Sequence, residues 1–199
     1  MNKINYQNIL LKTISKLTTR PKLLLHSCCA PCTSAVIESL VDHFDITLYF
    51  YNPNILPQEE YLLRLTCLQK FIIEFNLANN SQVKLVVPEY DQSQYFSTVA
   101  DIKQEKEGGS RCQACLTLRL ANSAKYASKY GFDYFCTTLT VSPYKNSTLI
   151  NQLGITLGQE NNVNFLCSDF AKNDGYKRSC ELSKQYGLYR QHYCGCNLD

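Results

Sequence analysis

Three cysteines lie within five residues of one another, directly after a short apolar run. Residues 22–26 read Lys-Leu-Leu-Leu-His, and Cys28, Cys29 and Cys32 follow in a turn that leads into a predicted helix over 32–41. The amino end of a helix presents free N–H groups and a positive dipole, and both stabilise the thiolate that binds metals or attacks electrophiles. Because three adjacent thiols are hard to explain by packing, this strand-turn-helix predicts a metal or redox site.

Strands and helices alternate along the rest of the chain. Apolar runs bounded by turn residues predict strands, and apolar positions at helical spacing predict the helices between them. The predicted strands cover 22–26, 45–51, 82–87, 132–137 and 163–166, and the predicted helices cover 32–41, 58–78, 112–130, 144–158 and 176–190. This alternation predicts an α/β fold, a three-layer sandwich with a mostly parallel central sheet. We expect one domain over 1–199, with 2–18 as an N-terminal helical extension.

A second thiol pair lies at another predicted helix start. Cys112 and Cys115 follow Gly108-Gly109 in an Arg-Cys-x-x-Cys segment. In a parallel sheet, ligands bind beyond the carboxyl ends of the strands, which is where the turn after 22–26 falls. Two thiolates from each turn would make a four-thiolate site for zinc or an iron–sulfur cluster. The alternative for the second pair is two half-buried helix cysteines.

A third pair, Cys194 and Cys196, flanks Gly195 near the carboxyl terminus. Two thiols this close can oxidise to a strained disulfide, and strained, exposed disulfides are usually the labile or catalytic ones. Gly195 supplies the backbone freedom that such a ring needs. Tyr189 and Tyr193 give the segment apolar surface with which to dock, and the alternative is a frayed tail with idle thiols.

Two further side chains fall at the same predicted edge of the sheet. His26 ends the first strand and is a candidate to orient a ligand or donate a proton, with a satisfied core histidine as the alternative. Asp169 follows the last strand and is a candidate acid, base or oxygen ligand, with helix capping as the alternative. The candidate catalytic residues are therefore Cys194, Cys196, His26 and Asp169. Of the lone cysteines, Cys67 and Cys136 are predicted to be buried and apolar, whereas Cys167 and Cys180 stay unassigned.

The cysteine count also bears on the compartment. The chain has eleven cysteines, an odd number that cannot pair completely within one molecule. No apolar run reaches the ~18 residues of a membrane span, and the first residues lack the plan of a signal peptide. We expect a cytoplasmic protein with no membrane partner, in which a reducing environment leaves the thiols to metal or redox chemistry. The net charge of +3 falls short of a basic nucleic-acid surface.

Together these motifs resemble the epoxyqueuosine reductase QueH family. The resemblance runs from about residue 22 to residue 197 and leaves 2–18 outside it. Its segments are His26-x-Cys-Cys-Ala-Pro-Cys32, Tyr51-Asn-Pro-Asn-Ile55, Arg111-Cys-x-x-Cys115, Thr137-Thr-Leu, Ser142-Pro-Tyr-Lys145, Tyr176-x-Arg-Ser179 and Tyr189-Arg-Gln-x-Tyr-Cys-x-Cys196.

The resemblance implies both a fold and a reaction. The fold would be of the nucleotide-binding (HUP-like) type, similar to that of tRNA-thiolation enzymes, with cysteines in place of a phosphate-binding loop. The reaction would remove the epoxide oxygen from epoxyqueuosine at the wobble position of tRNA, the last step of queuosine biosynthesis. Loops that carry Lys145, Lys177, Arg178 and Arg190 would hold the tRNA. The electron donor is not identified by the sequence.

The resemblance also implies a cofactor and its ligands. A 4Fe–4S cluster would be bound by four cysteines, namely Cys28, Cys29, Cys112 and Cys115. Cys194 and Cys196 would form a redox-active pair, and an extra iron would lie beside the cluster with ligands that the motifs do not assign. A strained Cys-x-Cys disulfide is oxidising, so its dithiol would relay electrons or protect the site instead of driving the reaction.

Two other classes of protein fit parts of the pattern. A strand followed by Cys29-Ala-Pro-Cys32 at a helix start also fits a thioredoxin-like dithiol oxidoreductase, although that interpretation leaves the other two cysteine pairs unexplained. A zinc-stabilised RNA-binding module with the same four thiolates is the non-enzymatic alternative. Colour separates the three, because an iron–sulfur protein is brown and the other two are colourless.

Overall fold

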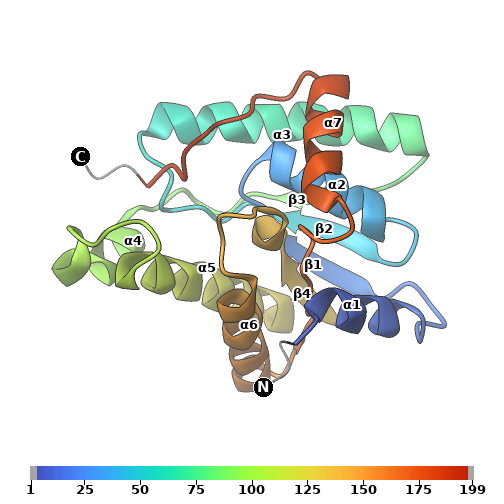
Figure 1. Cartoon of the computed structure of the whole chain (residues 1–199), viewed down its shortest axis with the longest axis horizontal. Coiled ribbons are helices and arrows are strands. Elements are labelled where there is room, and N and C mark those ends of the chain that lie inside the picture. The colour runs from blue at the N-terminus through green and yellow to red at the C-terminus, as the bar shows by residue number, and fades with distance from the viewer. Residues whose placement is uncertain (1–3, 197–199) are drawn as a thin grey trace.

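Five parallel strands form the centre of the structure, a computed structural model that describes residues 4–196 (Figure 1). The strands are β1 (Lys22–His26), β2 (Asp45–Tyr49), β3 (Lys84–Val86), β4 (Tyr134–Thr137) and β5 (Asn164–Phe165). Their order across the sheet is β3-β2-β1-β4-β5, and every described pairing is parallel. The predicted α/β sandwich is confirmed. Residues 2 and 3 of the predicted N-terminal extension lie outside the described residues.

Helices cover both faces of this sheet. The α-helices are α1 (Tyr6–Ile14), α2 (Ala30–Leu40), α3 (Gln58–Asn79), α4 (Ser93–Thr98), α5 (Ser110–Lys129), α6 (Ser147–Asn161) and α7 (Gly175–Gln185), and the 3-10 helices are η1 (Ala100–Ile102) and η2 (Thr138–Val141). Figure 1 shows α2, α3 and α7 on one side of the sheet and α5 with α6 on the other. Helices α4 and η1 lie in a segment for which the sequence predicts no element. No helix in the described part of the chain is long and apolar enough to cross a bilayer.

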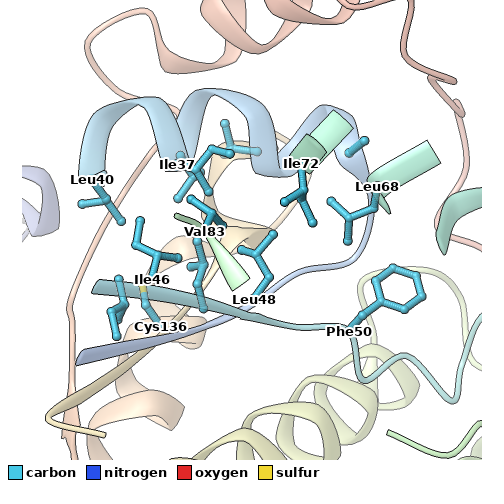
Figure 2. Packing of buried hydrophobic residues seen from close by; sticks show 14 of the residues in the cluster. Ile37, Leu40, Ile46, Leu48, Phe50, Leu68, Ile72, Val83 and Cys136 are labelled. Atoms are coloured by element: carbon cyan, nitrogen blue, oxygen red, sulfur yellow. The ribbon is translucent and has the colours of Figure 1, made fainter. Parts of the chain in front are cut away.

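Side chains of β1 alternate between the two layers. Leu23 and Leu25 are fully buried against α2 and α3, and Leu24 is fully buried against α5 and α6. Figure 2 shows the first layer, in which Ile46 and Leu48 of β2 face helix residues such as Ile37. Burial of a leucine-sized side chain contributes roughly 1.5–3 kcal/mol, so strands buried on both faces anchor the loops at their ends. Cys136 lies in the same layer, as predicted.

The strand order reverses direction beside β1, and this point locates the ligand crevice. The chain moves from β1 to β2 and β3 on one side, and then crosses to β4 and β5 on the other. His26 pairs with Thr137 at the carboxyl ends of β1 and β4. Such a reversal opens a crevice between the two outgoing turns. Those turns carry Cys28 and Thr138, whose side chains lie 4.0 Å apart.

Helix α7 ends five residues before its predicted end at 190. Gly187 has a φ of 57°, in the left-handed region, and the N–H of Leu188 donates to the carbonyl of Ser183 at 2.8 Å. A glycine in this conformation closes a helix with a backbone hydrogen bond across its last turn. The chain therefore leaves the helix at Gly187, and residues 188–196 run back as an irregular strap, coloured red in Figure 1. We call residues 188–196 the strap.

Candidate active site

A cavity of about 500 Å³ lies at the carboxyl end of the sheet, where the strand order reverses. The turn after β1 forms its floor together with η2, and α3, α7 and the strap form its walls. Four cationic side chains and one carboxylate are among the described lining residues, namely Arg64, Arg119, Lys145, Arg190 and Glu107. The cavity is therefore positively charged, which suits both thiolates and an anionic ligand.

Cys28, Cys29 and Cys32 gather at the floor of this cavity. Their Sγ atoms all lie within 4.8 Å of one another, and those of Cys28 and Cys29 are 3.6 Å apart. Hydrogen bonds from the other two thiols hold the pKa of Cys28 well below its usual range, and the pKa of Cys29 is raised to about 12 because it donates to Cys28. Three soft sulfur donors in one place fit a thiophilic metal, which would displace the shared protons.

Cys112 and Cys115 lie in the first turns of α5 and line a smaller cavity that adjoins the first. The N–H of Gly108 donates to Cys112 Sγ at 3.1 Å, and Cys115 is buried. Arg119, Lys145 and Cys194 line both cavities. The structure thus brings the two predicted cysteine pairs to the same edge of the sheet. It also places Cys32, which is not among the four predicted cluster ligands, beside the first pair.

Arg119 lies between the cysteine groups. Its side chain is 3% exposed, Nη2 donates to Asn52 Oδ1 at 2.7 Å, and Nε donates to His26 Nε2 at 3.3 Å. Burial raises the pKa of Cys115, and the guanidinium charge opposes that rise; the same charge lowers the pKa of Cys28 and of Cys194. A buried cation held rigidly by neutral partners is a permanent counter-charge for these sulfurs. Sequence reasoning missed it, because a single arginine inside a helix carries no pattern.

His26 is a buried hydrogen-bond partner of Arg119. The ring is fully buried, and its nitrogens lie 2.9 Å from Thr137 Oγ1 and 3.1 Å from the carbonyl oxygen of Tyr51. Burial, together with the charge of Arg119, lowers the pKa of His26 to about 3. The ring is not among the described residues that line the cavity. This geometry fits both the orienting role and a satisfied core histidine, and it disfavours proton donation to a substrate.

Asp169 lies outside the described lining of the cavity. Its Oδ2 accepts a hydrogen bond of 3.2 Å from Ser147 Oγ, in the first turn of α6. A carboxylate at the amino end of a helix is stabilised by the helix dipole. Asp169 thus lies beside the start of α6, whose cap is Asn146, and its catalytic role stays a prediction.

The strap places the thiol of Cys194 within hydrogen-bond distance of Lys145. Lys145 Nζ donates to Cys194 Sγ at 3.6 Å, and the same ammonium group lies 3.1 Å from Glu107. A hydrogen bond from Cys196, followed by the charges of Lys145 and Arg119, lowers the pKa of Cys194 to about 5, whereas the pKa of Cys196 is raised. Of the two thiols, Cys194 is thus the one that exists as thiolate near neutral pH.

The cations expected to hold tRNA differ in whether protein groups already occupy their hydrogen-bond donors. Arg178 donates two hydrogen bonds of 2.8 Å to Glu38 and one of 3.1 Å to Glu181, so its donors are committed to a surface ion pair. Lys145 is turned into the cavity, whereas Lys177 is exposed. Arg190 lines the cavity, with its guanidinium 5.2 Å from the centre of the Tyr176 ring.

A family model described as "Epoxyqueuosine reductase QueH" matches residues 23–198, most of the chain. The chain belongs to the epoxyqueuosine reductase QueH family. A QueH relative from Staphylococcus epidermidis is 45% identical across 98% of this chain and 84% of the relative. The relative from Streptococcus pyogenes is 43% identical across 98% and 77%, and that from Thermotoga maritima is 35% identical across 87% and 88%. The resemblance drawn from the motifs is confirmed, and the chain is an oxidoreductase of the QueH family.

Proposed function

We propose that this QueH-family chain reduces epoxyqueuosine to queuosine at the wobble position of tRNA. One observation carries the proposal: three groups of cysteines, distant in the sequence, line two adjoining cavities at the reversal point of the sheet. A thioredoxin-like enzyme needs one dithiol, and a structural zinc site needs four enclosed thiolates without a substrate cavity. A cavity of about 500 Å³ beside the thiols has the size of a site for a small organic group such as a modified base.

The stoichiometry of the reaction determines how many electrons and protons the site must supply. Removal of an epoxide oxygen breaks two C–O bonds, forms one C=C bond and releases water, so it consumes two electrons and two protons. Acting as a relay, Cys194 as thiolate and Cys196 as thiol would close to a disulfide and pass on two electrons and one proton, and the second proton would come from solvent. An external donor, whose identity stays open, would then reduce the disulfide again.

The cysteines fit the iron–sulfur cofactor that the resemblance implies. Thiolate sulfur is the usual ligand of such clusters, and both cysteine pairs lie at the amino ends of helices, α2 and α5. Cys28, Cys29, Cys112 and Cys115 would hold the 4Fe–4S cluster, which supplies one-electron transfer when bound. Cys32 is left over beside the first pair, and its sulfur is a candidate ligand for the extra iron.

The remaining residues of the site hold charge and exclude water. Lys145 stays protonated, because the charges of Cys194 and Glu107 raise its pKa despite burial. Its ammonium group keeps Cys194 as thiolate, and Arg119 does the same from the other side. Tyr144, which is 85% exposed, stands at the rim and offers a flat ring on which a base can stack. Lys177 and Arg190 are the cations we assign to tRNA phosphates, in a chain that acts in the cytoplasm.

Conversion of the modified base in tRNA tests the proposal. The chain, purified without oxygen and supplied with a chemical reductant, is expected to convert epoxyqueuosine-containing tRNA to queuosine-containing tRNA, as measured by mass spectrometry of the released nucleosides. The matched control is the Cys194→Ser, Cys196→Ser variant with its iron content checked, which we expect to lose multiple turnover. Metal-loaded wild-type protein that leaves the epoxide intact would refute the proposal.

A further inference from the structure

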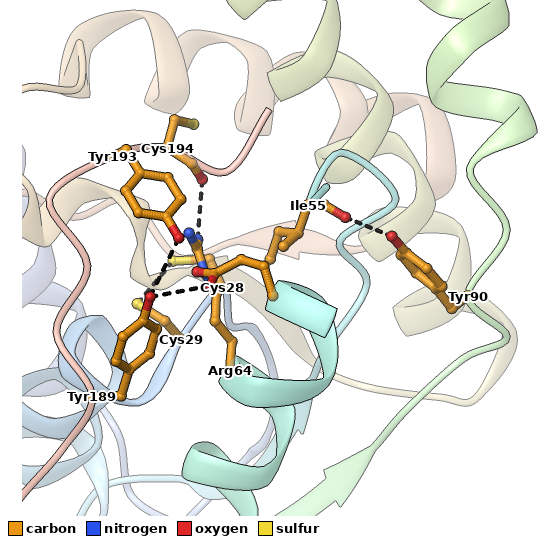
Figure 3. A network of polar contacts seen from close by, with 9 residues as sticks. Cys28, Cys29, Ile55, Arg64, Tyr90, Tyr189, Tyr193 and Cys194 are labelled. Atoms are coloured by element: carbon orange, nitrogen blue, oxygen red, sulfur yellow. Dashed lines mark hydrogen bonds and ion pairs between the residues drawn. The ribbon is translucent and has the colours of Figure 1, made fainter. Parts of the chain in front are cut away.

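A buried ion pair on α3 contacts the strap (Figure 3). Arg64 is 2% exposed, and its Nε donates to Glu60 Oε1 at 2.6 Å. The other contacts of the guanidinium group reach across to the strap: Nη1 donates to the carbonyl oxygen of Cys194 at 3.0 Å, and the group lies 5.3 Å from the centre of the Tyr193 ring.

Glu60, the acidic partner of Arg64, also contacts the strap. Its Oε2 accepts a hydrogen bond of 3.1 Å from the hydroxyl of Tyr189, and the hydroxyls of Tyr189 and Tyr193 lie 3.3 Å apart. The N–H of Leu56, just before α3, donates to the carbonyl oxygen of Gly195 at 2.7 Å. Both charges of the pair therefore bind the strap between Tyr189 and Cys194, and Leu56 adds a backbone hydrogen bond at Gly195.

The backbone at Gly195 packs closely against the guanidinium group of Arg64. Its φ of 98° is one that L-residues with a side chain rarely adopt, and a Cβ at this position would lie 2.9 Å from Arg64 Nη2. The guanidinium group thus lies flat against a backbone segment that tolerates only glycine. Closure of a disulfide ring, the role expected from the sequence, does not require such an approach to α3.

Stability is a poor explanation for a pair placed in this way. Loss of hydration largely offsets the mutual attraction of two buried charges, so apolar residues of similar volume would stabilise the fold as well. In contrast, a charged pair with fixed hydrogen-bond directions defines one position for the segment that it binds.

We propose that Arg64, held by Glu60, is a positioning residue that docks the Cys194–Cys196 segment over the cavity. The inference rests on the redox role of this pair in the proposed function. The docked position is the one in which Lys145 Nζ lies 3.6 Å from Cys194 Sγ. Without Arg64 the strap leaves the cavity wall, and Cys194 loses both the ammonium group and its place beside the substrate.

Alkylation of the thiols in the full-length, metal-loaded protein tests the docking directly. At about pH 9, where loss of the Lys145 contact costs little of the thiolate, Arg64→Met is expected to raise the iodoacetamide labelling rate of Cys194 about tenfold or more, because the strap opens locally while the core stays closed. Cys167, half-buried outside the described lining of the cavity, is the internal reference, and its rate is expected to stay constant. Arg64→Lys, which keeps the charge but loses the fork of donors, is expected to restore part of the protection.

The matched control is an exposed ion pair on the same helix. Lys70 and Glu74 have the same i, i+4 spacing, with Nζ and Oε1 3.8 Å apart. Lys70→Met is expected to leave the labelling of Cys194 unchanged. In the tRNA assay, Arg64→Met is expected to lower kcat about 100-fold, as misplacement of a reacting group does, with KM for tRNA within about twofold of wild type.

Two outcomes overturn the inference. One is a wild-type labelling rate of Cys194 in a folded Arg64→Met protein, and the other is a parallel rise in the labelling of Cys167, which would show a general loss of stability. If Arg64→Met does not fold, Gly195→Ala replaces it, because this variant leaves α3 unchanged and is expected to show the same labelling. The labelling needs no tRNA, so failure of the conversion assay alone refutes the proposed function and not the docking.

Discussion

Replacement of Cys112 and Cys115 by Ala is expected to remove iron from the protein and to lower turnover on epoxyqueuosine-containing tRNA more than about 100-fold. Both thiols lie in the first turns of α5, and both line the cavity beside Cys194. A site that has lost two of four thiolate ligands holds a cluster poorly. Iron and acid-labile sulfide per folded chain, measured after purification without oxygen, give the result.

The matched control removes two cysteines that lie outside the described lining of both cavities. Cys167→Ala with Cys180→Ala is expected to keep wild-type iron content. Cys32→Ala decides between two ligand sets, because Cys32 Sγ lies within 4.8 Å of the sulfurs of Cys28 and Cys29. Full iron–sulfur content without Cys112 and Cys115, together with its loss in Cys32→Ala, would assign the metal to the three cysteines at the start of α2 and contradict the proposed ligands.

Arg119→Met is expected to lower turnover about 10- to 100-fold, because Arg119 supports the sulfur groups without being one of the proposed ligands. The substitution removes a positive charge that faces Cys28, Cys115 and Cys194, so the thiolates lose a common counter-ion. Loss of that charge also disfavours the reduced form of a nearby redox group. The reduction potential of the bound cofactor is therefore expected to fall.

Arg119 also has a structural role, which the controls separate from the electrostatic one. Arg119→Lys keeps the charge but cannot contact both His26 and Asn52, and we expect its potential to lie near that of wild type with a smaller loss of turnover. Lys125→Met removes an exposed cation from the same helix and is expected to change neither quantity. A reduction potential in Arg119→Met equal to that of wild type would contradict the electrostatic role.

Local patterns in the sequence predicted the fold and the position of the site. The alternation of apolar runs and helical periodicity led to the parallel sheet, and reversal of strand order beside β1 places Cys28 at the crevice. Helix α7 was predicted too long because its apolar spacing continues past Gly187, whose left-handed conformation ends the helix. The signal was in the sequence, since glycine after a last helical turn is a common cap.

The residues that the sequence did not reveal act through long-range contacts. Arg64 and Cys194 are 130 positions apart, and Arg119 and His26 are 93 apart, so neither contact leaves a local pattern. Arg178 is the reverse case, in which a local pattern suggests a role and a distant residue competes for the side chain. Its place in a basic loop suggested tRNA binding, whereas Glu38, 140 positions away, occupies its donors. Asp169 was chosen for its place at the sheet edge, and Ser147 turns it toward α6.

The absorption spectrum of the wild-type chain, purified without oxygen, shows whether its cysteines hold an iron–sulfur cofactor beside a dithiol, as we propose. We expect a brown protein with broad visible absorption that bleaches on reduction, and about four iron and four sulfide per chain, with further iron if Cys32 holds it. A colourless protein that contains zinc, or no metal, after purification without oxygen and reconstitution with iron and sulfide would contradict the proposal.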